Sequence, residues 1–147
     1  MHTLCQDLAA IWRRTIPLAA AMGVEIEAFD ADELVVRAAL APNVNLHGTA
    51  FAGSLYSICA LTGWGLLWLE LRARGLDPGI VLAKASIGYR RAVAEAITCR
   101  CHFDAAAQAP QVERLLDTGR SSFVLECAVA AGGRRAVRFD GEYAVKL

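Results

Sequence analysis

The sequence predicts an α+β fold in which an antiparallel sheet of about six strands wraps around one long central helix, with an extra helix at the N-terminus. Two observations predict it: an uncharged apolar segment over residues 52–69, and several segments in which apolar and polar residues alternate. A helix that is apolar on every side must be buried, and strands with one polar face can cover it. The chain has 147 residues, so we expect a single domain over residues 1–147.

Composition narrows the classes of function. Hydrophobic residues make up 56% of the chain, charged residues 20%, and the formal net charge is zero. A neutral chain lacks the positive charge that nucleic-acid binding requires. The five cysteines form no CxxC pair and charged residues interrupt the N-terminal segment, which together predict a cytoplasmic protein without a signal peptide. Residues 51–69 are long enough to span a membrane, but their glycines and the half-polar strands that follow favour a buried helix and no membrane partner.

The first part of the chain is expected to form helices and then a hairpin. Residues 3–14 carry apolar residues at helical spacing, and Pro17 begins a short second helix that stops at Gly23. A turn at residues 30–33 joins the first strand to a second strand over residues 34–40. The first strand covers residues 24–29, and its apolar face is expected to carry Val24, Ile26 and Ala28.

The central helix is expected over residues 52–74, with Gly75 ending it. Gly63 and Gly65 inside this helix cost about 1 kcal/mol each relative to alanine, which predicts close approach of a strand, another helix or a ligand.

Four more strands and one short helix are expected after the central helix. Residues 110–116 form the helix, with Pro110 in its first turn, and Gly132-Gly133 is a hairpin turn. The strands are expected at residues 80–93, 97–103, 123–129 and 137–145. One face of the first of these strands is expected to carry Val81, Ala83, Ala85, Ile87 and Tyr89.

The segment over residues 43–54 leads from polar turn residues into a helix that starts with small residues. The first N–H groups of a helix have no partner within the helix and carry partial positive charge. Small residues allow another molecule to approach that backbone closely. The segment therefore predicts a site for a carbonyl oxygen or an anion.

Two strings resemble a known family, the thioesterase family that also occurs as the carboxy-terminal module of some GNAT acetyltransferases. The first is Asn45-x-His47-x-Thr49-x-Phe51-x-Gly53-Ser54-Leu55-Tyr56, followed by Leu61-Thr62-Gly63-Trp64-Gly65. The second, Ile87-Gly-Tyr89-Arg90-Arg91-Ala92-Val93, resembles the third-strand signature of hotdog thioesterases. The resemblance covers residues 17–147. It implies the hotdog fold, a homodimer or dimer of dimers with a site between a helix of one subunit and a strand of the other, and hydrolysis of an acyl-CoA or acyl-carrier-protein thioester.

The chemistry assigns roles to the residues at the start of the helix. Backbone N–H groups near Ala52 and Gly53 are expected to bind the thioester oxygen, or else Gly53 serves only packing. His47 is the candidate general base, and Asn45 positions water or orients the imidazole, because an extended segment would place both on one side. The alternative is that Asn45 and His47 only hold the loop through backbone hydrogen bonds. Thr49 is expected to cap the helix.

Other residues are candidates for substrate binding. Arg90 and Arg91 suit the phosphates of coenzyme A, although they also fit ordinary strand ends that point to opposite faces. No metal site is expected, and coenzyme A enters only as part of the substrate. The candidates at the acyl group are Phe51, Ser54, Tyr56, Thr62 and Trp64, for which core packing is the alternative.

One departure from the family keeps two further functions open. A related thioesterase group places a catalytic carboxylate inside the helix, and the matching position here is Ala60. A non-catalytic acyl-CoA binder or sensor is therefore an alternative to a thioesterase. A hotdog dehydratase is a third, although the helix offers only Glu70 as an acid, about 25 Å from its start.

Overall fold

The computed structural model describes residues 2–30 and 32–147 of the chain. Its strands are β1 (Glu25–Asp30), β2 (Glu33–Ala38), β3 (Gly79–Tyr89), β4 (Ile97–His102), β5 (Arg120–Ala131) and β6 (Arg134–Lys146). Its helices are α1 (His2–Thr15), α2 (Pro17–Met22), α3 (Ala52–Ala73) and α4 (Ala105–Thr118), and η1 (Ala41–Asn43) is a single 3₁₀ turn. The predicted turn at residues 30–33 includes residue 31, which lies outside the described residues.

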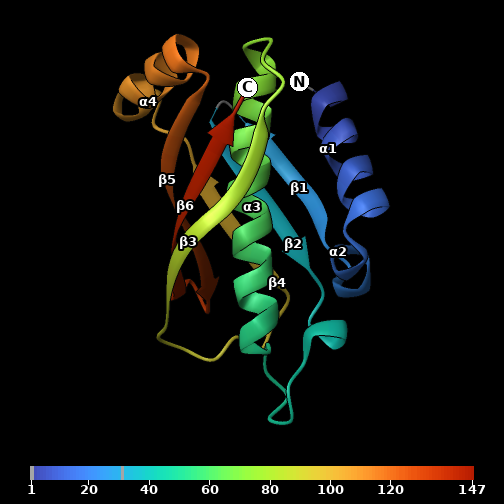
Figure 1. Cartoon of the computed structure of the whole chain (residues 1–147). Coiled ribbons are helices and arrows are strands. Elements are labelled where there is room, and N and C mark those ends of the chain that lie inside the picture. Colours follow the sequence, from blue (N-terminus) through green and yellow to red (C-terminus); the bar gives the residue numbers. More distant parts are fainter. Residues whose placement is uncertain (1, 31) are drawn as a thin grey trace.

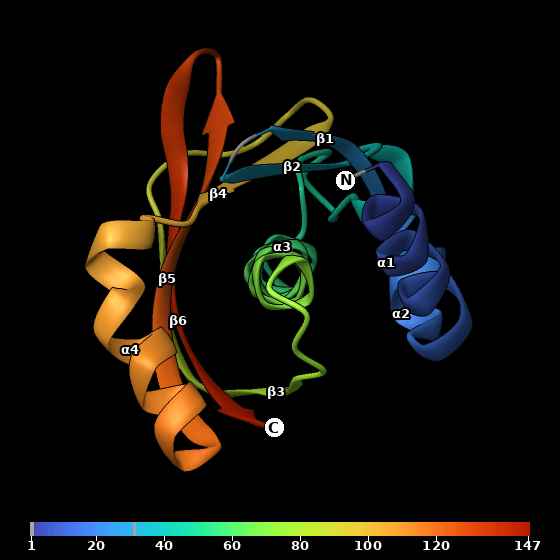
Figure 2. The same cartoon turned by 90° about the horizontal axis from the view of Figure 1, so that it is seen from above.

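The six strands form one antiparallel sheet in the order β1-β2-β4-β5-β6-β3. This sheet curves around α3, which Figure 2 shows end-on inside it, while α1 and α2 lie beside the helix and α4 lies on the outer face (Figures 1 and 2). The predicted α+β arrangement is therefore confirmed, with the strand count and the N-terminal helix as expected. This is the arrangement of the hotdog fold, in which one curved sheet wraps around a central helix.

The central helix forms where the sequence predicts it. It runs over Ala52–Ala73, and Gly75 follows with φ of 78° in the left-handed region that favours glycine. Its length and composition would also suit a membrane span, yet most of it is buried under the strands and α1. The all-round apolar surface is explained because different faces of α3 pack against β2, β3, β4, β5, β6 and α1.

The two glycines inside α3 are explained by close approach of neighbouring elements. A Cβ on Gly65 would lie 2.6 Å from Cζ2 of Trp12, so α1 packs directly on the helix backbone there. A Cβ on Gly63 would overlap the phenol of Tyr143. The hydroxyl of Tyr143 donates to the carbonyl of Ala60 at 2.9 Å, which fixes β6 against this turn of α3. Close approach of a helix therefore explains Gly65, and close approach of a strand explains Gly63.

Two β-bulges overturn the predicted strand faces. In β1 the register shifts between Ile26 and Ala28, so Ala28 is exposed and Phe29 packs against the core instead. In β3 the register shifts between Leu82 and Lys84, so Val81, which is 66% exposed, does not share a face with Ala85 and Ile87 as predicted. A bulge adds one residue to one strand, so an alternation that is correct on one side of it is reversed on the other. The residues of β3 that pack against the core are Ile80, Leu82, Ala85 and Ile87.

The helix after β4 is longer than predicted. It begins at Ala105, where the Asp104 carboxylate accepts a hydrogen bond from the Ala107 N–H at 3.0 Å. Pro110 therefore lies inside the helix rather than in its first turn. Proline is common in the first turn of a helix, but here it does not mark where the helix begins. Gly119 ends this helix with φ of 75°, as expected.

Candidate functional site

A surface cavity of about 330 Å³ lies at the N-terminal end of α3. Its walls come from three places: the loop before the helix, the first turn of the helix, and residues 89–93 beyond the end of β3. Asn45, Ala52, Arg90 and Arg91 all line it, so the fold brings four of the predicted site residues to one cavity.

The first turn of α3 offers backbone donors at this cavity. Phe51 is the residue before the helix, and no described side chain caps its N–H groups. The first internal hydrogen bond runs from the Leu55 N–H to the Phe51 carbonyl at 3.1 Å. The N–H groups of the preceding turn are therefore left for a ligand or water. Gly53 has a packing role as well, because a Cβ there would overlap the ring of Phe51, which folds over it.

Asn45 organises the loop before the helix. Its side-chain oxygen accepts hydrogen bonds from the N–H of His47 at 2.9 Å and the N–H of Thr49 at 3.1 Å. Its amide nitrogen donates to the Thr49 hydroxyl at 3.0 Å and to the Ala50 carbonyl at 3.4 Å. Asn45 therefore holds a tight turn that passes through Gly48, whose φ is 75°.

This turn changes the predicted relation between Asn45 and His47. The prediction that Asn45 and His47 lie on one side assumed an extended segment. Residues 46–49 form a turn instead, so this assumption is wrong. Asn45 is half-buried and lines the cavity, whereas the His47 side chain is exposed and does not belong to the described cavity lining. Thr49 is not a helix cap either, because its hydroxyl pairs with Asn45 and the helix begins three residues later.

Backbone contacts hold both ends of the loop. The Ala50 N–H donates to the Val93 carbonyl at 2.7 Å, and the Phe51 N–H donates to the Asn43 carbonyl at 2.7 Å. Asn43 is only 2% exposed. Its amide nitrogen donates to the carbonyls of Met22 and Ala39 at 2.9 and 2.8 Å. The start of α3 is thus tied to α2 through Asn43 and to the chain after β3 through Ala50.

Tyr89 lines the cavity, but the sequence did not predict it as a residue of the site. Its hydroxyl donates to the carbonyl of Ala52 at 2.9 Å, which joins the end of β3 to the first residue of α3. Burial raises the pKa of Tyr89 above its ordinary value, so the phenol stays protonated and able to donate. The aromatic residue before two arginines was visible in the sequence, but only the tertiary fold places it against Ala52.

Arg90 and Arg91 line the same cavity, which the sequence did not predict. Strand β3 ends at Tyr89 rather than at Val93, because the N–H groups of Arg90 and Arg91 both bond to the Ala136 carbonyl, at 2.7 and 3.3 Å. The expectation that they point to opposite faces of a strand is therefore wrong, and both line the cavity. Neither forms an ion pair within residues 2–30 and 32–147. Two unpaired guanidinium groups give the cavity a positive rim.

The candidates for acyl binding lie along α3 outside the described cavity lining. Thr62 is fully buried and donates its hydroxyl back to the Ile58 carbonyl at 2.6 Å. Trp64 donates from its indole to the Ile80 carbonyl of β3 at 3.0 Å. Tyr56 packs edge-on against Phe139, with ring centroids 5.3 Å apart. Ser54 is half-buried, and Phe51 is 55% exposed.

No acidic side chain lines the cavity in the part of the chain that the structure describes. Ala60 offers only its carbonyl, which accepts from Tyr143. Cys59 is buried, and its hydrogen bond with Cys99, together with burial, raises the pKa of its thiol and disfavours the thiolate. Among the described residues no group of three histidine, cysteine or acidic side chains is arranged to hold a metal ion.

Comparisons with known proteins identify the family and the fold. Over residues 5–147 the chain matches the protein family described as "Putative thioesterase (yiiD_Cterm)". It is similar to a solved structure of a "putative thioesterase" from Shewanella oneidensis, with 35% identity, all of both chains covered and a TM-score of 0.87. A protein of unknown function from Chlorobaculum tepidum is 27% identical with a TM-score of 0.94, over 97% of this chain and 94% of that one.

A further similarity concerns the fold alone. A solved structure from Pseudomonas aeruginosa is 17% identical, with a TM-score of 0.82 over 96% of this chain and 94% of that one.

The family match spans the loop, the start of α3 and the two arginines together. On this evidence the chain belongs to the hotdog-fold thioesterase family that its sequence resembles.

Proposed function

We propose that the protein hydrolyses an acyl thioester, carried by coenzyme A or an acyl-carrier protein, to a free acid and a thiol. The observation that carries the proposal is the uncapped first turn of α3, which opens into a cavity beside two unpaired arginines. The family match supports thioester chemistry in general.

The N–H groups near Ala52 and Gly53 would receive the thioester oxygen as it gains negative charge. Donors placed in this way are worth about 10²–10³ in rate each. They are well positioned for this role because Tyr89 and the Asn43 carbonyl hold the helix start in place. Asn45 lines the cavity, but its amide is engaged within residues 45–50, so it would act by holding the loop beside the position of the water molecule. His47 lies on the same turn and would be the general base.

Arg90 and Arg91 would bind the phosphates of the carrier. Guanidinium groups form paired, charge-assisted hydrogen bonds with phosphate oxygens, and both coenzyme A and acyl-carrier protein present phosphates. The side chains lie on the rim of the cavity, so the thioester end of such a carrier can reach the helix start. Five free cysteines suit a reducing compartment, and we place the protein in the cytoplasm.

The test measures thiol release from a panel of acyl-CoA substrates of increasing chain length. Asn45→Ala should lower kcat strongly with little change in KM, whereas Arg90→Gln with Arg91→Gln should raise KM, since these residues act on different parts of the substrate. Arg134→Gln, at the exposed first residue of β6, is the matched control and should leave both constants unchanged. No turnover above background across the panel, or equal effects of all three changes, contradicts the proposal.

The absence of an acid from the described cavity lining favours one second candidate, a protein that binds acyl-CoA without cleaving it. Acyl-CoA would then raise the melting temperature without release of thiol. A dehydratase has less support, because Glu70 is engaged with Arg74 at 2.7 Å near the other end of α3. Hydration of an enoyl thioester would be the observation in its favour.

A further inference from the structure

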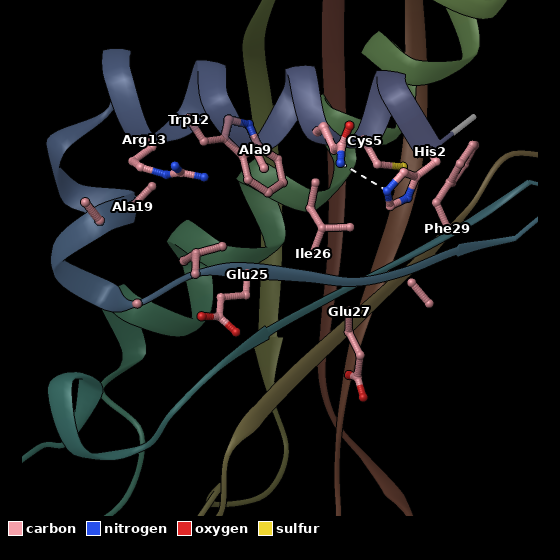
Figure 3. Close-up of a pocket in the computed structure, with 15 residues that line it drawn as sticks. His2, Cys5, Ala9, Trp12, Arg13, Ala19, Glu25, Ile26, Glu27 and Phe29 are labelled. Atoms are coloured by element: carbon pink, nitrogen blue, oxygen red, sulfur yellow. Dashed lines mark hydrogen bonds between the residues drawn. The ribbon is translucent and has the colours of Figure 1, made fainter.

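A second cavity, larger than the one at the start of α3, lies elsewhere in the described chain. It has a volume of about 880 Å³ and lies between the N-terminal helices α1 and α2 and the edge strand β1 (Figure 3). This volume falls within the range of sites that hold small molecules, about 300–1,000 Å³. Nothing in the proposed hydrolysis uses this cavity.

The walls of this cavity are mainly apolar. Ala9 and Trp12 come from α1, Ala19 comes from α2, and Ile26 and Phe29 come from β1. Figure 3 shows Ile26 and Phe29 on the side of β1 that faces α1, while the carboxylates of Glu25 and Glu27 point away from α1. Ile26 and Phe29 share a side because the bulge in β1 lies between them. The bulge therefore places two apolar side chains on this wall, while Glu25 and Glu27 line the cavity with their carboxylates directed away from α1.

Two polar groups of α1 are available to a ligand here. Trp12 is only 3% exposed, and its indole Nε1 has no hydrogen-bond acceptor among residues 2–30 and 32–147. A buried donor without a partner is unfavourable, and an acceptor atom of a ligand would remove that cost. The neighbouring Arg13 is exposed, makes no ion pair within the described residues, and extends into the gap between α1 and β1 (Figure 3).

We propose that this cavity binds a carboxylic acid with an aliphatic tail, with the tail against the apolar walls and the carboxylate at Arg13 and the Trp12 N–H. A carboxylate has two oxygens, so it can accept from the guanidinium and the indole together. A neutral tail alone would leave both donors unused, and a cationic head would be repelled by Arg13. This site is separate from the cavity at Ala52, and the inference does not depend on the hydrolysis.

The test measures binding of sodium decanoate by calorimetry, with decanol and decylamine as probes that share the tail. We expect one saturable site for decanoate and weaker binding of the other two. Arg13→Gln should weaken decanoate binding about tenfold or more, because a hydrogen bond to a charged group contributes about 1.5–3 kcal/mol. Trp12→Phe keeps an aromatic side chain, although a smaller one, and removes the N–H, and should weaken decanoate binding more than decanol binding.

Matched controls come from neighbouring residues that do not line the cavity. Arg14→Gln removes the next positive charge on α1 and should leave decanoate binding unchanged. Ala9→Phe should block the site, whereas Ala10→Phe on the exposed side of α1 should not. Arg90→Gln should leave decanoate binding intact, which separates this site from the cavity at α3. Circular dichroism melting identifies any variant that is unfolded.

Several results would overturn the inference. They are the absence of saturable decanoate binding, equal affinity for decanol and decanoate, or equal losses from Arg13→Gln and Arg14→Gln. Loss of binding on Arg90→Gln would instead assign decanoate to the α3 cavity. Because the readout is binding rather than turnover, an inactive protein that binds decanoate as described still supports this site.

Discussion

Several single residues act on the backbone of α3. Glycines leave it accessible to neighbouring side chains, and a tyrosine hydroxyl bonds to it. Gly63 and Gly65 let Tyr143 and Trp12 pack against the α3 backbone, and Tyr89 bonds the first carbonyl of the same helix. The sequence predicted that a neighbouring element or a ligand approaches these two glycines closely. The residues that supply it lie 80 positions later in β6 and 53 positions earlier in α1.

At the residue scale we expect Gly63→Ala to lower the free energy of unfolding by about 1–3 kcal/mol, because the new methyl group displaces the Tyr143 phenol from a close-packed core. Chemical denaturation measures this change. Gly88→Ala is the control, since a Cβ at Gly88 meets no described atom within 4 Å. If the Tyr143→Phe background does not reduce the effect of Gly63→Ala, the clash with the hydroxyl is not its cause.

Tyr143 also gives a prediction for pH dependence. Burial raises its pKa above the ordinary value of 10.0, so the folded protein keeps a proton that the unfolded chain releases. The resulting stability is fully present below pH about 10 and is lost as pH rises toward the raised folded pKa. Urea denaturation between pH 8 and 11 should show this decline, and Tyr143→Phe should make it less steep. A variant with the same slope as the wild type would refute the assignment.

At the scale of elements, the loop that joins η1 to α3 positions the site. Asn43 is the anchor of that loop, because it bonds two carbonyls from earlier elements through its side chain and the Phe51 N–H through its backbone. The order of the helix start therefore depends on a residue that does not line the cavity.

We expect Asn43→Ala to destabilise the protein by about 1–3 kcal/mol, since the buried Met22 carbonyl and the partly buried Ala39 carbonyl lose their donor. Below its melting temperature the variant should also lose thiol-release activity, because the first turn of α3 is less well fixed. Pro42→Ala changes the preceding, exposed residue and serves as the control. A variant that is destabilised yet fully active at low temperature would show that Asn43 does not position the site.

At the scale of the whole molecule, the sheet has two free edges within the described residues, β1 and β3. Edge β1 is flanked by α1, as Figure 2 shows, whereas β3 lies at the open end of the curve. Val81 and Tyr89 on β3 are exposed, as is Phe51 at the nearby helix start. An uncovered edge with apolar side chains is a surface for pairing with another strand.

We therefore expect the protein to form a homodimer through β3, with the cavity at α3 lying beside the partner. Light scattering after size-exclusion chromatography should give twice the mass of one chain, and Val81→Lys should shift it toward the monomer and reduce activity. Val124→Lys is the control, because Val124 is similarly exposed at 58% but lies on β5, away from this edge. A monomeric wild-type protein would contradict this expectation.

The sequence by itself determined the class of fold, the place of the central helix, the loop that precedes it and the family. Hydrophobic period, turn residues and a long motif are local properties, so they can be read without neighbours. Only the tertiary structure decided which residues of β1 and β3 face inward, that Arg90 and Arg91 line one cavity, and that Tyr89 meets Ala52. Bulges and strand ends are set by pairing with partner strands, and cavities by the distance between packed elements, so neither is encoded in a short stretch of chain.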